Sequence, residues 1–163
     1  MRNVKGVAYG PEGQVVSCLF CRIISREEPG AIVLENSKMV AFKTIAPASS
    51  NHLLIVPREH RANVHSLSGK EDADLVKEMK KFAVEALLED GCPVDGVDCT
   101  LEGTSQFSFH VPPWNSIDHL HLHAIGNRQS MSLAGALKYW EGSFYCWSAE
   151  EAVENIKKQL AKL

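Results

Sequence analysis

Hydrophobic residues recur every three or four positions through one long segment in the middle of the chain, which places them on one face of a helix. Ser68 and Glu71 have the spacing of a capping box at its start, and Gly91 and Pro93 follow its end. An apolar stripe of this width is usually core, although it also suits a partner-binding face. We expect core; its members are Leu75, Val76, Met79, Phe82, Ala83, Ala86 and Leu87.

Shorter apolar runs bounded by turn residues predict a sheet of about five strands. The candidate segments are residues 31–34, 39–42, 52–56, 97–101, 106–111 and 117–125. Ser148 and Glu151 form a second capping box ahead of a C-terminal helix. Strands interrupted by one long helix, without a βαβ repeat, predict an α+β fold with a mostly antiparallel sheet and the helices on one face.

The first residues of the chain lack any such pattern. Residues 1–16 hold three glycines and a proline without sustained periodicity, so we predict a flexible N-terminal arm there. Residues 17–163 are expected to form a single domain, because 163 residues is the length of one compact domain.

The composition is that of a soluble globular protein, with 45% hydrophobic and 23% charged residues. The net charge of −3 gives no general reason to bind nucleic acid or a membrane, so neither partner is expected. The sequence shows no apolar run of about 18 residues, and residues 1–14 lack the apolar core of a signal peptide. Its five cysteines do not resemble a disulfide framework. We therefore predict a cytoplasmic location, with the nucleus as a second one.

His119, His121 and His123 alternate with leucines in the run DHLHLHAI. Alternate side chains of a strand point to the same face, so the three imidazoles would stand in a row while the leucines anchor the strand in the core. Near neutral pH an imidazole can act as a nucleophile, a proton donor or an orienting group. The same spacing also suits two zinc ligands completed by a third histidine or a carboxylate.

The run HLHLHAI resembles the signature of the histidine triad superfamily. The segments CLFCRII, MVAF and HLLIVPREH match its Hint branch in the same order, and FHVPP followed by Ser116 is similar to the aprataxin-like Hint subgroup. This resemblance covers residues 18–125. It implies the histidine triad fold, no organic cofactor, and hydrolysis or nucleotidyl transfer at the α-phosphorus of an adenosine-type nucleotide, of the phosphoramidase or adenylylsulfatase type.

The resemblance also implies roles for the three histidines. His121 would attack phosphorus and carry a covalent nucleotidyl group, which suits imidazole because it is both a good nucleophile and a good leaving group. His123 would protonate the leaving group and then help to activate water. His119 would support His121 by hydrogen bonding or take part in a metal site.

Four further residues match substrate-binding positions of the family. Ser116 would contact phosphate, and His110 would reach a phosphate oxygen. Phe42 would form an apolar wall against the base or belong to the core. Thr44 stands where the Hint pattern has an aspartate that accepts hydrogen bonds from the ribose hydroxyls, so ribose binding is expected to be weaker or differently arranged. The expected substrate is a purine nucleotide, an AMP conjugate.

Cys18 and Cys21 have the spacing of half a zinc site. The resemblance to Hint relatives that carry this CxxC pair implies that His60 and His119 complete a closed, structural zinc site. A redox-active cysteine pair and two buried thiols without metal are the alternatives.

Two other hypotheses about function stay open. The first is a metallohydrolase that uses the histidines as ligands to a catalytic zinc. The second is a non-catalytic nucleotide-binding or scaffold protein, which Thr44 makes credible. By analogy with Hint proteins, a second copy of the chain is a further expected partner, in a homodimer. The identity of the leaving group is not encoded in any motif.

Overall fold

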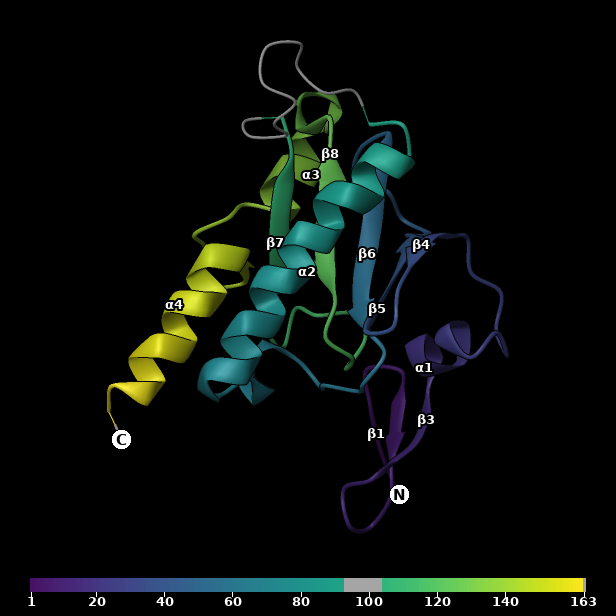
Figure 1. The fold of residues 1–163 in the computed structure, drawn as a ribbon, viewed down its shortest axis with the longest axis vertical. Helices are drawn as coiled ribbons and strands as arrows, with labels where there is room; N and C mark the ends of the chain where they lie inside the picture. The colour runs from purple at the N-terminus through teal and green to yellow at the C-terminus, as the bar shows by residue number, and fades with distance from the viewer. Residues whose placement is uncertain (93–103, 163) are drawn as a thin grey trace.

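The computed structural model describes residues 1–92 and 104–162. At its centre lies a six-stranded antiparallel sheet in the order β4-β5-β6-β8-β7-β9 (Figure 1). Its strands are β4 (Ile32–Glu35), β5 (Met39–Lys43), β6 (Asn51–Pro57), β7 (Gln106–His110), β8 (Leu122–Gly126) and β9 (Cys146–Ser148). The predicted α+β fold with a mostly antiparallel sheet is confirmed.

Two helices lie in front of this sheet in Figure 1, α2 (Gly69–Glu89) and α4 (Ala149–Leu160). They pack against each other, and α2 also packs on β6 and β8. The shorter helices are α1 (Leu19–Ile24) and α3 (Leu133–Lys138), with 3-10 turns at Val64–Ser66 and Arg128–Ser130. Within the described residues, none of the helices has the length and apolar character needed to cross a bilayer.

The apolar stripe of α2 lies in the core, as the sequence predicts. Its buried residues form one cluster with Leu120, Leu122 and Ala124, the residues that alternate with the histidines. Side chains alternate between the two faces of β8, so His123 faces the opposite side of the sheet, and the ring of His121 lies next to it with the centroids 5.1 Å apart. There the ring of His121 meets the ring of Phe20 edge to face, with the centroids 5.3 Å apart.

The two predicted capping boxes have different outcomes. The box at α4 is present, because Ser148 Oγ accepts from the backbone N–H of Glu151 at 3.1 Å and the Glu151 carboxylate accepts from the N–H of Ser148 at 2.7 Å. Ser68 does precede α2, but the box predicted with Glu71 is wrong. The backbone N–H of Ser68 instead donates to the carboxylate of Asp72 at 2.7 Å, and its hydroxyl makes no cap.

Residues 1–16 differ from the predicted flexible arm, because they form a small antiparallel sheet seen at the bottom of Figure 1. Its strands are β1 (Arg2–Val4), β2 (Val7–Tyr9) and β3 (Val15–Cys18). Val7 and Tyr9 are buried in a second apolar cluster. Strands this short show no periodicity in the sequence, and Gly6 and Gly13, with φ of +73° and +81°, make the turns between them.

The strand expected over residues 117–125 is shorter than predicted, because β8 begins only at Leu122. The stretch before it bonds elsewhere: the backbone N–H of Leu120 donates to the carbonyl of Arg61 at 2.6 Å. The strand predicted over residues 97–101 lies outside the described residues.

Candidate active site and metal cluster

His121 presents a ring nitrogen without a partner on the histidine face of the sheet. Its Nδ1 lies 2.6 Å from the backbone carbonyl of His119, and because a carbonyl only accepts, Nδ1 carries the hydrogen. The neutral ring then has its lone pair on Nε2, a buried atom with no hydrogen-bond partner among the described residues. Burial lowers the pKa of His121 to about 4, so the ring is neutral at pH 7.

A chain of hydrogen bonds gives His123 the opposite tautomer. The backbone N–H of Ala48 donates to Nδ1 of His52 at 3.0 Å, which leaves the hydrogen of neutral His52 on Nε2. That hydrogen is directed at Nδ1 of His123, 3.0 Å away. Neutral His123 therefore carries its own hydrogen on Nε2, which also lacks a partner in the described part of the chain.

The two rings are neighbours with complementary chemistry. The centroids of His121 and His123 are 5.1 Å apart. Burial lowers the pKa of His52 to about 4 and holds the pKa of His123 well below its ordinary value. His52 and His123 are therefore neutral at pH 7, as His121 is. Nε2 of His121 offers a lone pair to an electrophile, and Nε2 of His123 offers a hydrogen bond to a leaving group.

His119 uses its backbone and its ring for different contacts. Its carbonyl holds His121, as described above. Its ring is fully buried, with Nε2–H donating to the carbonyl of Pro57 at 3.0 Å. The other nitrogen, Nδ1, faces Cys18 Sγ at 3.4 Å and Cys21 Sγ at 3.6 Å. The sequence predicted that His119 either supports His121 by hydrogen bonding or takes part in a metal site. The two roles involve separate atoms, because the backbone carbonyl bonds to His121 and the ring Nδ1 faces the cysteines.

Cys18, Cys21, His60 and His119 sit close enough to bind one metal ion, because their ligand atoms all lie within 4.8 Å of one another. The hydrogen bond from Cys21 holds the pKa of the Cys18 thiol well below its ordinary value, against the effect of burial. The Nε2–H of His119 is bound to a carbonyl, the outer contact typical of a metal-ligating histidine. The four residues therefore fit a metal ion.

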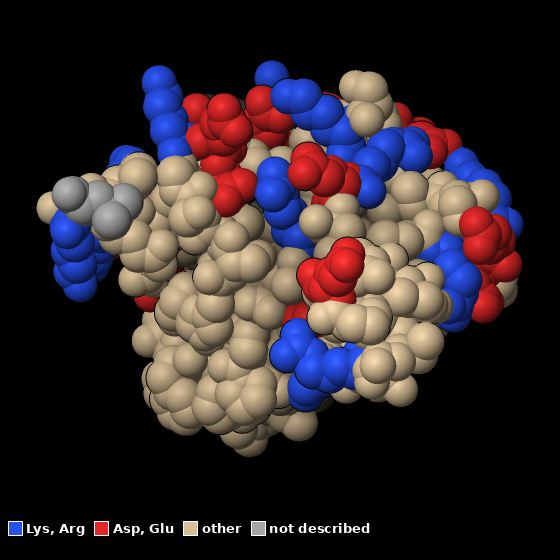
Figure 2. All heavy atoms as spheres, turned by 90° about the horizontal axis from the view of Figure 1, so that it is seen from below, with Lys and Arg blue, Asp and Glu red and all other residues tan. Residues whose placement is uncertain are grey.

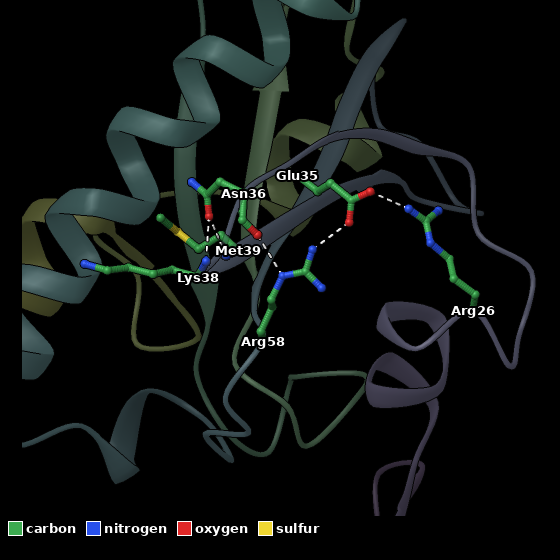
Figure 3. A network of polar contacts seen from close by, with 6 residues as sticks. All are labelled: Arg26, Glu35, Asn36, Lys38, Met39 and Arg58. Carbon is green, nitrogen blue, oxygen red and sulfur yellow. Dashed lines mark hydrogen bonds and ion pairs between the residues drawn. The ribbon is translucent and has the colours of Figure 1, made fainter.

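Segments that carry this cluster are tied to the sheet by the polar network of Figure 3. Glu35, the last residue of β4, pairs with Arg26 after α1 through one oxygen and with Arg58 after β6 at 2.6 Å through the other. Arg58 Nε also donates to the carbonyl of Asn36 at 2.7 Å. Exposed ion pairs are individually weak, but this network spans three segments. It restrains α1 and the start of the loop that carries His60.

A cavity of about 680 Å³ opens beside His123. All four residues predicted to bind substrate line it, namely Phe42, Thr44, His110 and Ser116. Its wall is largely apolar, with residues from α1, from β5 and from the end of α3. An apolar cavity with a few polar groups, among them the imidazoles of His110 and His123, is typical of a small-molecule site.

Two polar residues of the cavity, Thr44 and His110, already have protein partners. Thr44 Oγ1 accepts from the backbone N–H of Ala46 at 3.3 Å, so its own hydrogen is left to donate. His110 Nε2–H donates to the carbonyl of Lys138 at 3.1 Å, which leaves Nδ1 for a ligand, and burial lowers the pKa of His110. Phe42 is 3% exposed, so it is both core and cavity wall.

Comparison with known proteins gives the family. Residues 17–138 match the protein family described as "Scavenger mRNA decapping enzyme C-term binding". The adenosine 5'-monophosphoramidase HINT3 of Xenopus tropicalis is 32% identical over 87% of this chain and 88% of its own length. The bifunctional adenosine 5'-phosphosulfate phosphorylase/adenylylsulfatase HINT4 of Arabidopsis thaliana is also 32% identical, over 90% and 96%. The chain belongs to the histidine triad superfamily, in its Hint branch.

A solved structure agrees with this assignment to the histidine triad superfamily. The HIT family hydrolase from Clostridium thermocellum matches with a TM-score of 0.58 at 30% identity, over 69% of this chain and 92% of that one. The match gives independent support for the fold of the sheet and its helices.

Sequence reasoning missed three residues of this histidine triad site. His52 fixes the tautomer of His123, and Lys138 and Tyr139 line the cavity. His52 lies at the start of β6, and β6 pairs with β8 so that Leu54 is opposite His123. That pairing joins segments about seventy residues apart, so no local pattern in the sequence reveals it.

We predict that His52 makes stability depend on pH. Its pKa is about 4 in the folded protein, against roughly 6.5 in the unfolded chain. The unfolded chain therefore binds more protons between these values. The contribution is complete above about pH 6.5 and is lost as pH falls toward 4, by up to about 3 kcal/mol. His52→Gln keeps an N–H donor but does not titrate. Its free energy of unfolding should therefore fall less than that of the parent protein when the pH is lowered.

Urea unfolding at pH 7 and about pH 4.5 measures the difference. His65→Gln is the matched control, because His65 is exposed and should lose as much stability as the parent protein. An equal loss in His52→Gln and the parent would contradict the assigned burial of a neutral ring.

Proposed function

We propose that the protein is a hydrolase and nucleotidyl transferase that acts at the α-phosphorus of adenosine-type nucleotides, through a covalent intermediate on Nε2 of His121. The observation that carries the proposal is the pair of opposite tautomers in His121 and His123. The names of the relatives support it, since they act as an adenosine 5'-monophosphoramidase and as an adenylylsulfatase.

In the first step, the lone pair on Nε2 of His121 attacks the α-phosphorus. The bond from phosphorus to the leaving group breaks while Nε2–H of His123 donates a hydrogen bond to the departing atom. A leaving amine takes its proton from the substrate, which binds protonated on the bridging nitrogen, and sulfate leaves as a dianion. The His121 ring becomes cationic as the N–P bond forms. Its Nδ1–H bond to the carbonyl of His119 stabilises that charge, because a hydrogen bond from a charged donor is stronger than one from a neutral donor.

In the second step, water enters in place of the leaving group, and Nε2–H of His123 donates a hydrogen bond to a phosphoryl oxygen. The water oxygen attacks phosphorus, its proton passes to the released amine or to a phosphoryl oxygen, the N–P bond breaks, and the electron pair returns to Nε2 of His121. The free nucleotide leaves with both rings in their starting tautomers. His52 keeps its hydrogen directed at Nδ1 of His123 throughout, so the hydrogen of His123 stays on Nε2 and faces the substrate.

The cavity residues bind the nucleotide half of the substrate in this proposal. Phe42 and the apolar residues of α1 form the wall for the base, and Ser116 with His110 contacts the phosphate. Thr44 replaces a carboxylate at the ribose with a single hydroxyl. The leaving group needs only to reach Nε2 of His123, which is consistent with more than one chemistry among the named relatives.

We further propose that Cys18, Cys21, His60 and His119 hold a structural zinc ion. Two thiolates and two imidazoles are the donor set of a closed tetrahedral zinc site. Bound there, zinc would tie α1 to the loops of His60 and His119 and supply no reaction chemistry. This favours the covalent mechanism over a catalytic zinc, because four protein ligands leave no position open for water.

The proposed partner is a small nucleotide in a reducing, cytoplasmic environment. Figure 2 shows acidic and basic side chains interspersed above a wide uncharged area, without a continuous basic surface on that face of the described residues. A nucleic acid would need such a surface to neutralise its phosphates. A homodimer is also proposed. The sheet ends at β9 on one side and at β4 on the other, so these are the strands at which a second copy could extend the sheet.

We predict that His121→Ala abolishes turnover of an adenosine phosphoramidate while AMP binding changes little, because the ring makes the covalent bond and the cavity makes most other contacts. Steady-state kinetics and calorimetry with AMP separate the two effects. His65→Ala is the control, since this exposed ring is not among the residues that line the cavity and should leave both quantities unchanged. Turnover comparable to the parent in His121→Ala would refute the covalent mechanism.

We predict that Thr44→Asp tightens the binding of AMP. A carboxylate accepts both ribose hydroxyls, and a hydrogen bond to a charged group contributes roughly 1.5–3 kcal/mol, or about tenfold or more in affinity. The 2'-deoxy analogue should gain less, so the ratio of the deoxy-AMP to the AMP dissociation constant should widen.

Calorimetry of both nucleotides with parent and variant measures that ratio. Thr44→Asn is the matched control, because it has the same shape as Asp without the charge and should widen the ratio less. An unchanged ratio in Thr44→Asp would mean that position 44 does not face the sugar.

A further inference from the structure

The small N-terminal sheet reaches the metal cluster through the hydroxyl of Tyr9. Tyr9 is 7% exposed and lies at the end of β2. Its Oη is 3.4 Å from Nε2 of His60 and donates to Oδ2 of Asp118 at 2.6 Å. The rings of Tyr9 and His60 meet edge to face, with the centroids 6.2 Å apart. A residue outside the histidine motifs thus contacts one member of the cluster directly.

Asp118 is held from three sides. Besides Tyr9, its other carboxylate oxygen accepts from Asn63 Nδ2 at 2.7 Å, and its backbone N–H donates to the carbonyl of Lys5 at 2.9 Å. Asp118 is 6% exposed, so the hydrogen bonds from Tyr9 and Asn63 satisfy a buried carboxylate. Asn63 is three residues beyond His60 in the sequence, and Asp118 immediately precedes His119. The carboxylate therefore joins the two loops that carry the histidines of the cluster.

The direction of each hydrogen bond follows from the geometry of the cluster. Nδ1 of His60 faces Cys21 Sγ at 3.6 Å, so it is the nitrogen on the metal side. A histidine that ligates through Nδ1 carries its hydrogen on Nε2. That hydrogen points at Tyr9 Oη, and the hydroxyl of Tyr9 in turn donates a hydrogen bond to the carboxylate of Asp118. The result is a relay from His60 through Tyr9 to a carboxylate.

We propose that Tyr9 and Asp118 are positioning residues for the metal site and raise its affinity for zinc by orienting His60. This inference rests on the zinc site proposed above. Outer contacts of this kind fix the tautomer and orientation of a ligand, and their loss typically weakens metal binding about 10- to 100-fold. The two histidine ligands have different outer partners: the carbonyl of Pro57 for His119, and a carboxylate reached through a hydroxyl for His60.

The test is the zinc affinity of the full chain, measured by competition with a chromophoric chelator. Tyr9→Phe removes one hydroxyl and keeps the ring, and it should bind zinc about 10- to 100-fold more weakly. Tyr145→Phe is the matched control. It loses a comparable hydrogen bond, from Tyr145 Oη to the carbonyl of Leu137 at 2.6 Å, and neither residue belongs to the cluster. Its affinity should equal that of the parent.

A second variant covers the case in which Tyr9→Phe does not fold. Asp118→Asn keeps the size of the side chain and removes the charge, and it should weaken zinc binding in the same direction. Where both single variants fold, the double variant should lose less affinity than the two losses combined, because the residues act in one relay. Thermal unfolding of zinc-free and zinc-loaded protein separates positioning from support of the fold. Loss of a positioning residue reduces the gain in melting temperature on adding zinc, relative to the parent protein.

The outcomes distinguish this inference from the zinc site itself. One equivalent of zinc in the parent, lost in Cys18→Ser but bound with parental affinity by Tyr9→Phe, overturns the role of Tyr9 and leaves the zinc site in place. Parental zinc affinity in Asp118→Asn would likewise overturn the role of Asp118 and leave the zinc site in place. A parent protein that binds no zinc overturns both proposals. Weaker binding in Tyr9→Phe with parental affinity in Tyr145→Phe supports the relay.

Discussion

The hydrogen bond from Nδ1 of His121 to the backbone carbonyl of His119, 2.6 Å long, is the interaction on which the rest of the site depends. It fixes the tautomer of the attacking ring and so places a lone pair on Nε2. Its acceptor belongs to a residue whose ring lies in the metal cluster. Anything that moves His119 therefore moves the partner of the nucleophile. The leucines on either side of His121 are buried under α2 and hold the same segment from the opposite face of the sheet.

Burial supplies the second condition, which is neutrality. The complementary tautomers exist only while both rings are uncharged, because a protonated imidazole carries a hydrogen on each nitrogen. Desolvation keeps the pKa of His121 at about 4 and the pKa of His123 well below its ordinary value. The chain of hydrogen bonds from Ala48 through His52 then determines which nitrogen of His123 carries the hydrogen. Neutrality comes from the apolar surroundings, and the assignment of hydrogens comes from individual bonds.

Local sequence patterns predicted those parts of the protein that depend on local spacing. The stripe of α2, the division of leucines and histidines between two faces, and the Cys18–Cys21 pair all follow from spacing. His60 and His119 as further members of the cluster came from the resemblance to Hint relatives. The N-terminal sheet was missed because strands of three or four residues carry no period. His52 was missed for a different reason, because its role depends on the pairing of β6 with β8. Likewise, no pattern shows that Tyr9 reaches the cluster, since its partner Asp118 is more than a hundred residues away.

The covalent mechanism is tested most directly by identifying the atom that carries the nucleotide during turnover. Protein mixed with an adenosine phosphoramidate is quenched rapidly in alkaline denaturant, digested and analysed by mass spectrometry. We expect one adenylyl group on the peptide that contains His121, on its Nε2, and no adduct in His121→Ala. Turnover by the parent protein without any adduct, or with the adduct on another residue, would contradict the covalent mechanism.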